Sequence, residues 1–313
     1  MIGFLLRRLG ASVVLLFVTA LLTFVLLSIP NQDVGRQLLG LQATQAAIDA
    51  KNAQLGLDRP ILVQFFAWLL PALQGDLGRS WFSSENVAVA IGNRLPVTLS
   101  LMISVTIVTA VVGYSLGVWA GVRRGAVDRF VQIFSVAGYA LPGFLVTILL
   151  VIVFAVQLRW FPAIGYTPIT TSFTGWLATI TLPTIALSLS AVAGIAQQVR
   201  SSVIEVMRAD YVRTLITRGL PPRRILFRHV LRNASAPALV VLGMQFVGLL
   251  GGAVIVEQIF GLPGIGSMTI KYTTQGDIPV IMGLVMLSAI GVVLINLLVD
   301  LGIGWLLPKA RVS

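Results

Sequence analysis

The feature that most limits how this chain can fold is a set of six apolar stretches, each about 20 residues or longer. A helix of that length crosses a hydrocarbon layer of about 30 Å, and only helices or closed barrels satisfy their backbone groups in lipid. Charged residues make up 11% of the 313, too few to cover a soluble domain of this size. We therefore predict an all-α integral membrane protein with six transmembrane helices. The expected spans are Leu9–Ile29, Val97–Gly121, Phe130–Gln157, Leu177–Gln198, Ala234–Val256 and Pro279–Leu307.

The distribution of basic residues predicts the orientation of these helices, because Lys and Arg favour cytoplasmic loops. Placing the N-terminal helix (residues 1–30) with its start in the cytoplasm puts most of the 22 Lys and Arg inside. We expect both termini, including a tail at 308–313, to be cytoplasmic. The inner set comprises Arg7, Arg8, Arg123, Arg124, Arg129, the eight arginines from Arg200 to Arg232, Lys309 and Arg311.

Residues 31–96 then form a sizeable external segment. It contains a helix-like stretch ending near Gly56 and a second apolar stretch, Ile61–Leu70, that is too short to cross a bilayer. We expect that second stretch to lie along the outer interface, with Trp68 and Trp81 at headgroup level. The segment is either a cap over the helices or a docking surface for an external partner.

Several kinds of chemistry are not supported by the residues present. The first five expected spans hold no Asp, Glu, Lys, Arg or His, which argues against a self-sufficient proton- or ion-coupled carrier. One histidine and no cysteine argue against a zinc or haem site. No phosphate-binding glycine-rich loop with a lysine occurs, and the serines have no histidine partner in the membrane. We expect no cofactor in this chain.

Small and polar residues suggest how the helices meet. Gly113 and Gly117 in the second span and Gly248 and Gly252 in the fifth lie four residues apart, which lets helix backbones approach closely. These faces pack within the subunit, form a dimer interface or line a pathway. Pro142 and Pro183 are expected to interrupt the third and fourth helices, which suits a curved cavity wall, and Gln245 either cross-links helices or contacts a polar solute.

The loop 199–233 concentrates positive charge between the fourth and fifth spans. Asp210 is suited to cap a helix of about two turns, and Gly219 followed by Pro221 and Pro222 ends it. A second helix is expected to begin near Arg223 and to run toward the fifth span.

A helix this short is stable only when packed, and its apolar residues Tyr211, Val212, Leu215 and Ile216 are predicted to lie on one side. Three uses remain open: a topology signal among anionic lipids, a nucleic-acid helix-turn-helix that lacks supporting helices, or a helix that docks on a cytosolic ATPase.

The loop resembles that of bacterial ABC importer permeases, whose pattern is Glu-Ala-Ala, three residues, Gly, nine residues, Ile-x-Leu-Pro. Gly219 and Leu231 keep this spacing, whereas His229 and Arg232 occupy the Ile and Pro places. The departure is similar to the loop of the peptide/nickel branch, "DYVRTxxxxGLxxRRxxxRHxLRNA". The stretches "GLDRP", "GDLGRS", "RLPVTLSL", "GVRRGAVDR", "GGAVIVEQIFGLPGIG" and "NLLVDLGIGWLLPKAR" extend the resemblance over nearly the whole chain.

The resemblance implies a type I importer fold, with a permease core at 97–307, in the bacterial inner membrane. It also implies a second homologous permease, two ATPases that bind ATP and Mg²⁺, and an extracytoplasmic solute-binding protein, with membrane lipid around the helices and no nucleic acid. The coupling residues would be Asp210, Tyr211, Val212, Arg213, Thr214, Leu215, Ile216, Arg218, Gly219 and Leu220.

Within that set, Tyr211, Leu215 and Ile216 would be the buried contacts, and Arg213 and Arg218 would pair with ATPase carboxylates. The substrate expected for this branch is a peptide, with a nickel or other metal chelate or glutathione as alternatives. The absence of His and Cys from the spans argues against direct ligation of bare Ni²⁺.

Overall fold

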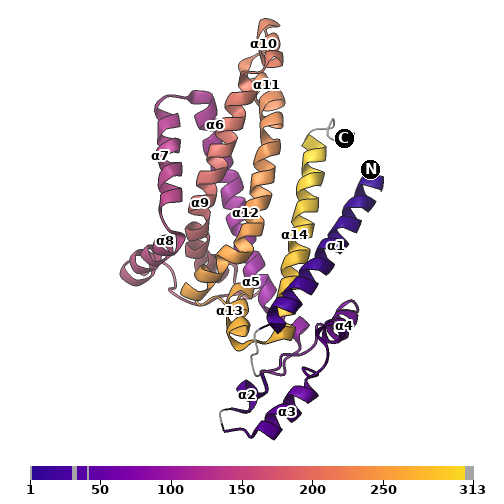
Figure 1. The fold of residues 1–313 in the computed structure, drawn as a ribbon. Helices are drawn as coiled ribbons and strands as arrows, with labels where there is room; N and C mark the ends of the chain where they lie inside the picture. The colour runs from indigo at the N-terminus through magenta and orange to yellow at the C-terminus, as the bar shows by residue number, and fades with distance from the viewer. Residues whose placement is uncertain (1, 30–33, 41, 307–313) are drawn as a thin grey trace. The chain divides into compact units, whose positions relative to one another are not determined.

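The computed structural model of the chain describes residues 2–29, 34–40 and 42–306 (Figure 1). Every regular element among these residues is a helix, and the β-type pairing in them is an isolated bridge between Arg79 and Asn86. The all-α prediction is confirmed. The expected tail at 308–313, with Lys309 and Arg311, lies outside the described residues.

The described residues contain five helical stretches that are long and apolar enough to cross a membrane. A sixth candidate is a pair of helices bent by 94°, Ala126–Ala140 followed by Gly143–Gln157, so the total agrees with the six predicted spans if that pair is one span. The five unbroken stretches are Gly10–Ser28, Val87–Arg123, Phe173–Met207, Pro222–Ile259 and Ile278–Leu306.

Several of these helices extend past the apolar runs that predicted them. The fourth was expected over Leu177–Gln198, whereas α9 runs from Phe173 to Met207. At its start, the Ser172 Oγ accepts a hydrogen bond from the Gly175 amide at 3.1 Å. The helix also continues through polar residues beyond Gln198, because hydropathy marks contact with lipid and not the end of backbone hydrogen bonding.

The two expected helix breaks have different outcomes. Pro142 separates α7 (Ala126–Ala140) from α8 (Gly143–Leu150), as predicted. Pro183 does not interrupt α9, so that prediction was wrong. Pro183 is buried in a helix that packs against four others, and this packing holds the helix together despite the lost hydrogen bond, whereas the residues beside Pro142 are exposed.

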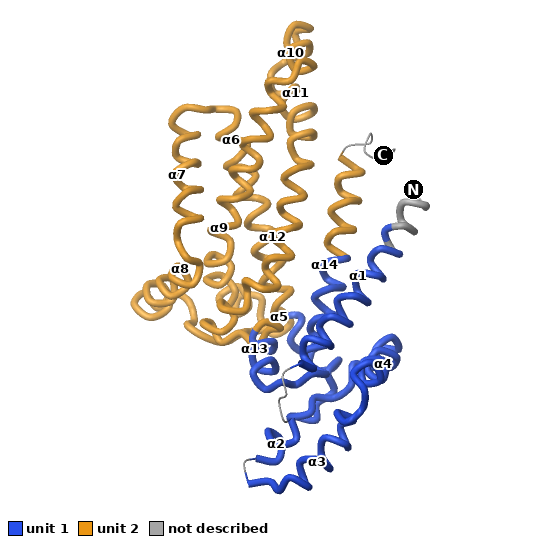
Figure 2. Tube along the Cα trace, viewed as in Figure 1, with its two compact units in different colours: residues 1–96, 267–293 blue, residues 97–266, 294–313 orange. Residues whose placement is uncertain are grey.

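The chain divides into two compact units, residues 1–96 with 267–293 and residues 97–266 with 294–313 (Figure 2). Unit 1 contains the expected external helix, which ends at Gln54 before Gly56 in a left-handed conformation (φ 71°). The short apolar stretch is helix α4. The helices of unit 1 are α1 (Ile2–Ser28), α2 (Val34–Leu39), α3 (Gln45–Gln54), α4 (Ile61–Ala72) and parts of α5 (Val87–Val108), α13 (Ile265–Gln275) and α14 (Ile278–Leu306).

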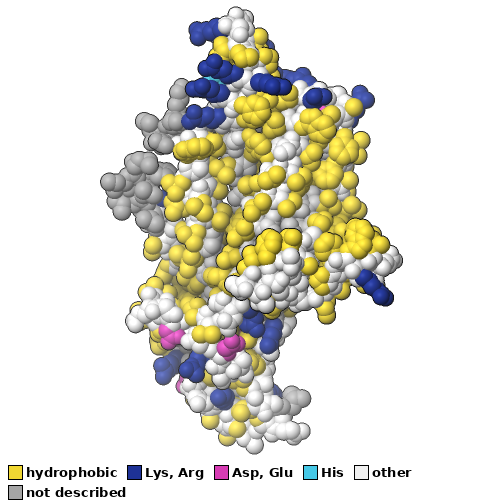
Figure 3. Space-filling model, turned by 180° about the vertical axis from the view of Figure 1, so that it is seen from behind, with side chains coloured by type: hydrophobic (Ala, Val, Ile, Leu, Met, Phe, Trp, Pro, Cys, Tyr) yellow, Lys and Arg dark blue, Asp and Glu magenta, His cyan; other side chains and the backbone are white. Residues whose placement is uncertain are grey.

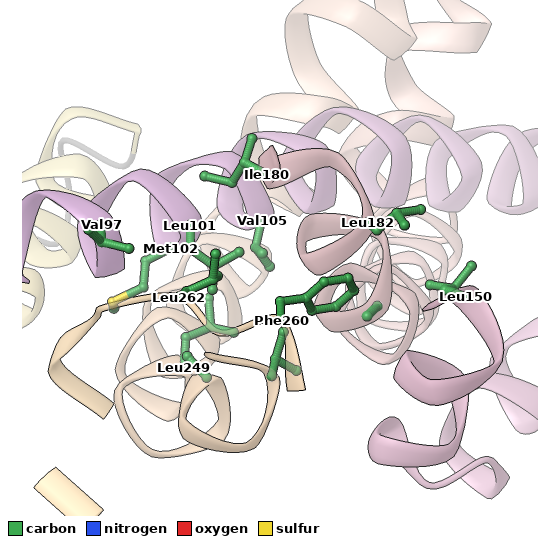
Figure 4. Close-up of a cluster of buried hydrophobic side chains, with 13 residues drawn as sticks. Val97, Leu101, Met102, Val105, Leu150, Ile180, Leu182, Leu249, Phe260 and Leu262 are labelled. Atoms are coloured by element: carbon green, nitrogen blue, oxygen red, sulfur yellow. The ribbon is translucent and has the colours of Figure 1, made fainter. Parts of the chain in front are cut away.

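Unit 2 is built around α9, which packs against α6, α7, α8 and α12. Its largest core joins Leu101 and Val105 of α5 to Ile180 of α9, Leu249 of α12 and Phe260 (Figure 4). The remaining elements of this unit are η1 (Thr109–Gly113), α6 (Tyr114–Arg123), η2 (Val151–Gln157), α10 (Asp210–Thr217), α11 (Pro222–Ile225), η3 (Leu226–Val230), α12 (Leu231–Ile259) and the last part of α14, where η marks a π-helix.

Candidate functional site

The predicted docking helix is α10, a separate two-turn helix at one end of unit 2 (Figure 1). Its N-cap is Ala209, with φ −65° and ψ 144°, and Asp210 is the first helical residue. The prediction that Asp210 caps this helix was therefore wrong by one position. The Asp210 carboxylate lies in the first turn, where its negative charge stabilises the helix by interacting with the positive end of the helix dipole. It also lies 3.6 Å from the Arg213 guanidinium in an exposed ion pair.

The end of α10 follows the prediction for Gly219. Its φ of 76° lies in the left-handed region, and its amide donates to the Ile216 carbonyl at 2.9 Å. The Leu220 amide donates to the Leu215 carbonyl at 3.3 Å. Together these two bonds form the Schellman arrangement, in which glycine reverses the chain and satisfies the last carbonyls. Pro222 then begins α11, in agreement with the predicted second helix.

The inner face of α10 packs on its own unit. Val212 is fully buried, and Leu215 and Leu220 cover it in part. The buried cluster that Val212 joins also contains residues of both flanking helices, so α10 belongs to the same core as α9 and the start of α12. That cluster contains Ile195, Val199 and Val203 of α9, Ile225 of α11, Val230 of η3, and Ala234 and Ala238 of α12.

The outer face of α10 is exposed. Tyr211 is 42% exposed, Ile216 is 56% exposed, and the Arg213 side chain is 73% exposed. Thr214, Arg218 and Gly219 are exposed as well.

The four apolar residues Tyr211, Val212, Leu215 and Ile216 lie on one side of α10, as predicted, but the chain buries only part of that side. At 3.6 residues per turn they cover an arc of about 140°, and only its centre, Val212 and Leu215, turns inward. Tyr211 and Ile216 form the two edges of that arc and remain available to a partner.

Two residues outside α10 were not singled out by the sequence. Asn233 of α12 donates from Nδ2 to the Tyr211 hydroxyl at 2.8 Å and to the His229 carbonyl at 3.1 Å, which holds the tyrosine ring against the base of α12. Phe227 is 69% exposed in η3. The π-helix changes the side-chain register there, so helical periodicity could not place Phe227 outside the core.

The charge around this surface is positive, and Figure 3 shows basic side chains gathered at the end of unit 2 that carries α10. Asp210 is the one acidic residue from Arg208 to Asn233. A short helix with exposed apolar edges inside a basic surround suits an apolar cleft with an acidic rim. The exposed basic residues in this stretch are Arg208, Arg213, Arg218, Arg223, Arg224, Arg228 and Arg232.

The glycines predicted to support close helix approach fall into two groups. A Cβ on Gly117 of α6 would lie 2.6 Å from the Ala196 carbonyl oxygen and 2.7 Å from the Val199 Cβ, both on α9. A Cβ on Gly113 would lie 3.1 Å from Ile195 of the same helix. These glycines therefore serve packing within the subunit.

Gly248 and Gly252 on α12 behave differently. Both are exposed, and a Cβ on either would meet no atom of the described chain within 4 Å. Gln245, on the same helix, donates from Nε2 to the Ala191 carbonyl of α9 at 3.2 Å, which matches the cross-linking role considered for it. Among the described residues, the glycine face of the fifth span has no neighbour, whereas that of the second span packs on α9.

Glu257 was missed because the expected fifth span stopped at Val256, whereas the helical stretch continues to Ile259. Its side chain is fully buried, and its Oε1 accepts a hydrogen bond from the Thr98 hydroxyl at 2.7 Å. Thr98 Oγ1 accepts in turn from the Ile265 amide at 2.8 Å. A Cβ at Gly264 would overlap the Glu257 carboxyl group, so this glycine is required for the turn between α12 and α13 to close over the carboxyl group.

Groups of three or more His, Cys, Asp or Glu side chains placed to hold a metal ion are not found within the described ranges.

Comparisons with known proteins agree on one family. Residues 113–312 match the family described as "Binding-protein-dependent transport system inner membrane component", and residues 1–102 match its N-terminal region. A probable peptide ABC transporter permease protein, y4tP of Sinorhizobium fredii, is 37% identical over 309 residues, 98% of this chain and 99% of the relative.

Two further relatives bear on substrate and fold. The glutathione transport system permease protein GsiC of Escherichia coli O6:H1 is 33% identical over 312 residues, 99% of each chain. A solved structure of the MetNI methionine ABC transporter in an inward-facing conformation matches with a TM-score of 0.54 and 18% identity. The match covers 69% of this chain and 95% of that one, and it shows a shared fold.

Proposed function

This chain belongs to the family of binding-protein-dependent transport system inner membrane components, and we propose that it is the permease of a peptide importer driven by ATPases on separate subunits. In this role both termini and α10 face the cytoplasm, as the distribution of basic residues favours. The chain provides the path and the mechanical connection, while ATP and Mg²⁺ bind to the partner ATPases.

The observation that carries the proposal is the division of α10 into a fixed inner face and a free outer face. Val212 anchors the helix to its own unit, whereas Tyr211 and Ile216 are exposed around it. In the proposed complex these two side chains enter an apolar cleft on an ATPase. Arg213 and Arg218, both exposed, pair with carboxylates at its rim.

The same packing explains how movement would pass into the membrane. Because α10 shares one buried cluster with α9 and α12, displacing α10 displaces the ends of both helices. Closure of two ATPases around ATP would then rotate the helices as rigid bodies and switch the cavity between its two openings. The ATPase contacts must differ between these states, since a partner shifts an equilibrium only by binding its states unequally.

The open glycine face on α12 suits a second permease. A Cβ at Gly248 or Gly252 would meet no atom of the described residues within 4 Å, and small residues allow another helix to approach closely in lipid. We therefore place the homologous partner subunit along this helix, with the transport path beside it. An extracytoplasmic solute-binding protein delivers the substrate on the opposite side from α10.

A peptide is the substrate we propose, because the relatives that share almost the full length include peptide permeases. The glutathione permease among them is consistent with small peptides as a class. Binding of di- to pentapeptides, glutathione and nickel chelates to the cognate solute-binding protein would separate these substrates. Binding of a metal chelate alone would contradict the peptide assignment.

The central test uses Ile216→Asp with Ile216→Leu as its matched control. The aspartate places a charge on the exposed edge of α10 without touching the buried cluster, so membrane insertion and thermal stability should stay unchanged. We expect Ile216→Asp to lose co-purified ATPase subunits and substrate-stimulated ATP hydrolysis, and Ile216→Leu to retain both. Normal stimulation of hydrolysis by loaded binding protein in Ile216→Asp would refute the docking role.

A further inference from the structure

Helix α4 of unit 1, with sequence ILVQFFAWLLPA, has almost no polar side chain and no charged one. Its one amide, Gln64, is used locally, because Nε2 donates to the Leu57 and Arg59 carbonyls at 3.2 and 2.7 Å. A helix that is apolar on all sides is stable where it is buried in protein or surrounded by lipid. At 12 residues, α4 is too short to cross a bilayer.

One face of α4 packs on two of the membrane helices of its unit. Phe65 is fully buried, with its ring 5.9 Å from that of Phe17 and 5.7 Å from that of Phe24, both on α1. Phe65 and Leu69 share a buried cluster with Met282 of α14.

The face of α4 beside this packed one is exposed. Leu62 and Leu70 are each 59% exposed, and Phe66 is 46% exposed. These three residues are spaced four apart and form one stripe along the helix, which we call the α4 outer stripe. Large apolar side chains left bare in a row need an apolar covering, since water would oppose their exposure.

The depth of α4 identifies that covering. Arg8 marks the polar boundary of α1, because it lies just before the apolar stretch Gly10–Ser28 and an arginine at the end of a membrane span reaches to the headgroups. At 1.5 Å per residue, Phe17 lies about 14 Å from Arg8 along the axis, and Phe24 about 24 Å. Phe65 contacts both rings, so α4 crosses α1 between these two levels. The hydrocarbon layer is about 30 Å thick, which places α4 inside it.

We propose that α4 is embedded in the hydrocarbon of the leaflet opposite Arg8, with its outer stripe against lipid acyl chains. The position is deeper than the headgroup interface expected from the sequence. A partner protein in water is a poorer occupant, because the stripe carries no charge to form a polar rim. This embedding anchors the segment between α1 and α5 to the bilayer, independently of the function proposed for α10.

The chain has no cysteine, so single-cysteine variants allow a clean test. Spin labels at Phe66→Cys and Leu70→Cys would be measured in full-length chain reconstituted in phosphatidylethanolamine and phosphatidylglycerol vesicles. Val14→Cys, on α1 and 62% exposed, is the hydrocarbon control, and Ala53→Cys, exposed on α3, is the water control. Collision with oxygen reports lipid, and collision with a water-soluble nickel chelate reports water.

We expect both α4 labels to match Val14→Cys, with strong collision with oxygen and loss of collision with the nickel chelate. Collision with the chelate at the level of Ala53→Cys would overturn the proposal in favour of an aqueous surface. Protection from both reagents would overturn it in favour of a protein contact. Either result would leave the docking role of α10 unaffected.

Discussion

Adding one methyl group at two glycines of different environment tests how the helices pack. In Gly117→Ala the new Cβ would lie 2.6 Å from a backbone oxygen of α9 and 2.7 Å from the Val199 Cβ, so α6 and α9 must separate. Overpacking of this kind costs about 1–3 kcal/mol. In Gly248→Ala the new Cβ would meet no described atom within 4 Å. Both changes gain the helix propensity of alanine, roughly 1 kcal/mol, so the difference between them isolates the steric cost.

Thermal unfolding of the purified chain in detergent measures that difference. Gly117→Ala should melt below Gly248→Ala by several degrees, since each kcal/mol corresponds to about 2 °C or more in a chain of this size. Equal melting temperatures would refute the reasoning from backbone proximity. Gly248→Leu adds a larger side chain at the same position. It should reduce co-purification of the partner permease without lowering the melting temperature of the isolated chain. Unchanged co-purification would remove α12 from the proposed interface.

Two further changes probe the turns. At Gly219 φ is 76° and no described atom lies within 4 Å of a new Cβ, so a side chain there should cost about 1–2 kcal/mol through backbone strain alone. Because asparagine tolerates this conformation better than valine, Gly219→Val should speed amide hydrogen exchange across α10 more than Gly219→Asn does. Equal exchange in the two variants would contradict this. Burial raises the pKa of the Asp277 carboxyl group, whose Oδ2 accepts a hydrogen bond from the Ser80 hydroxyl at 2.6 Å. The contribution of Asp277 to the free energy of unfolding is therefore largest at low pH and declines as the pH rises through the pKa of the folded state. Asp277→Asn should remove the fall in melting temperature that begins as the pH rises above the ordinary pKa of an aspartate. An unchanged dependence of the melting temperature on pH would assign that fall to another group.

The sequence predicted the elements that depend on local chemistry. Long apolar runs identify membrane helices because lipid leaves the backbone few alternatives. The end of α10 was predictable as well, since Gly219 and the prolines after it determine the local backbone.

The parts that depend on tertiary packing could not be read from the chain. Pro142 and Pro183 look alike in sequence, yet Pro142 is exposed between two helices whereas Pro183 is buried inside α9. Gly117 and Gly248 have the same spacing pattern but opposite environments. At the candidate site, the sequence defined an apolar arc on α10, and only the positions of α9 and α12 show that Leu215 turns inward while Ile216 remains outside.

The most direct test of the account is photo-crosslinking from position 216 in membranes that contain the complete importer. A photoreactive phenylalanine derivative at Ile216, on the outer face of α10, should yield an adduct with an ATPase subunit. The same residue at Ile133, which is 70% exposed on the membrane helix α7, should yield none. Absence of an ATPase adduct at position 216, or equal adducts at both positions, would contradict the claim that α10 connects this permease to ATP hydrolysis.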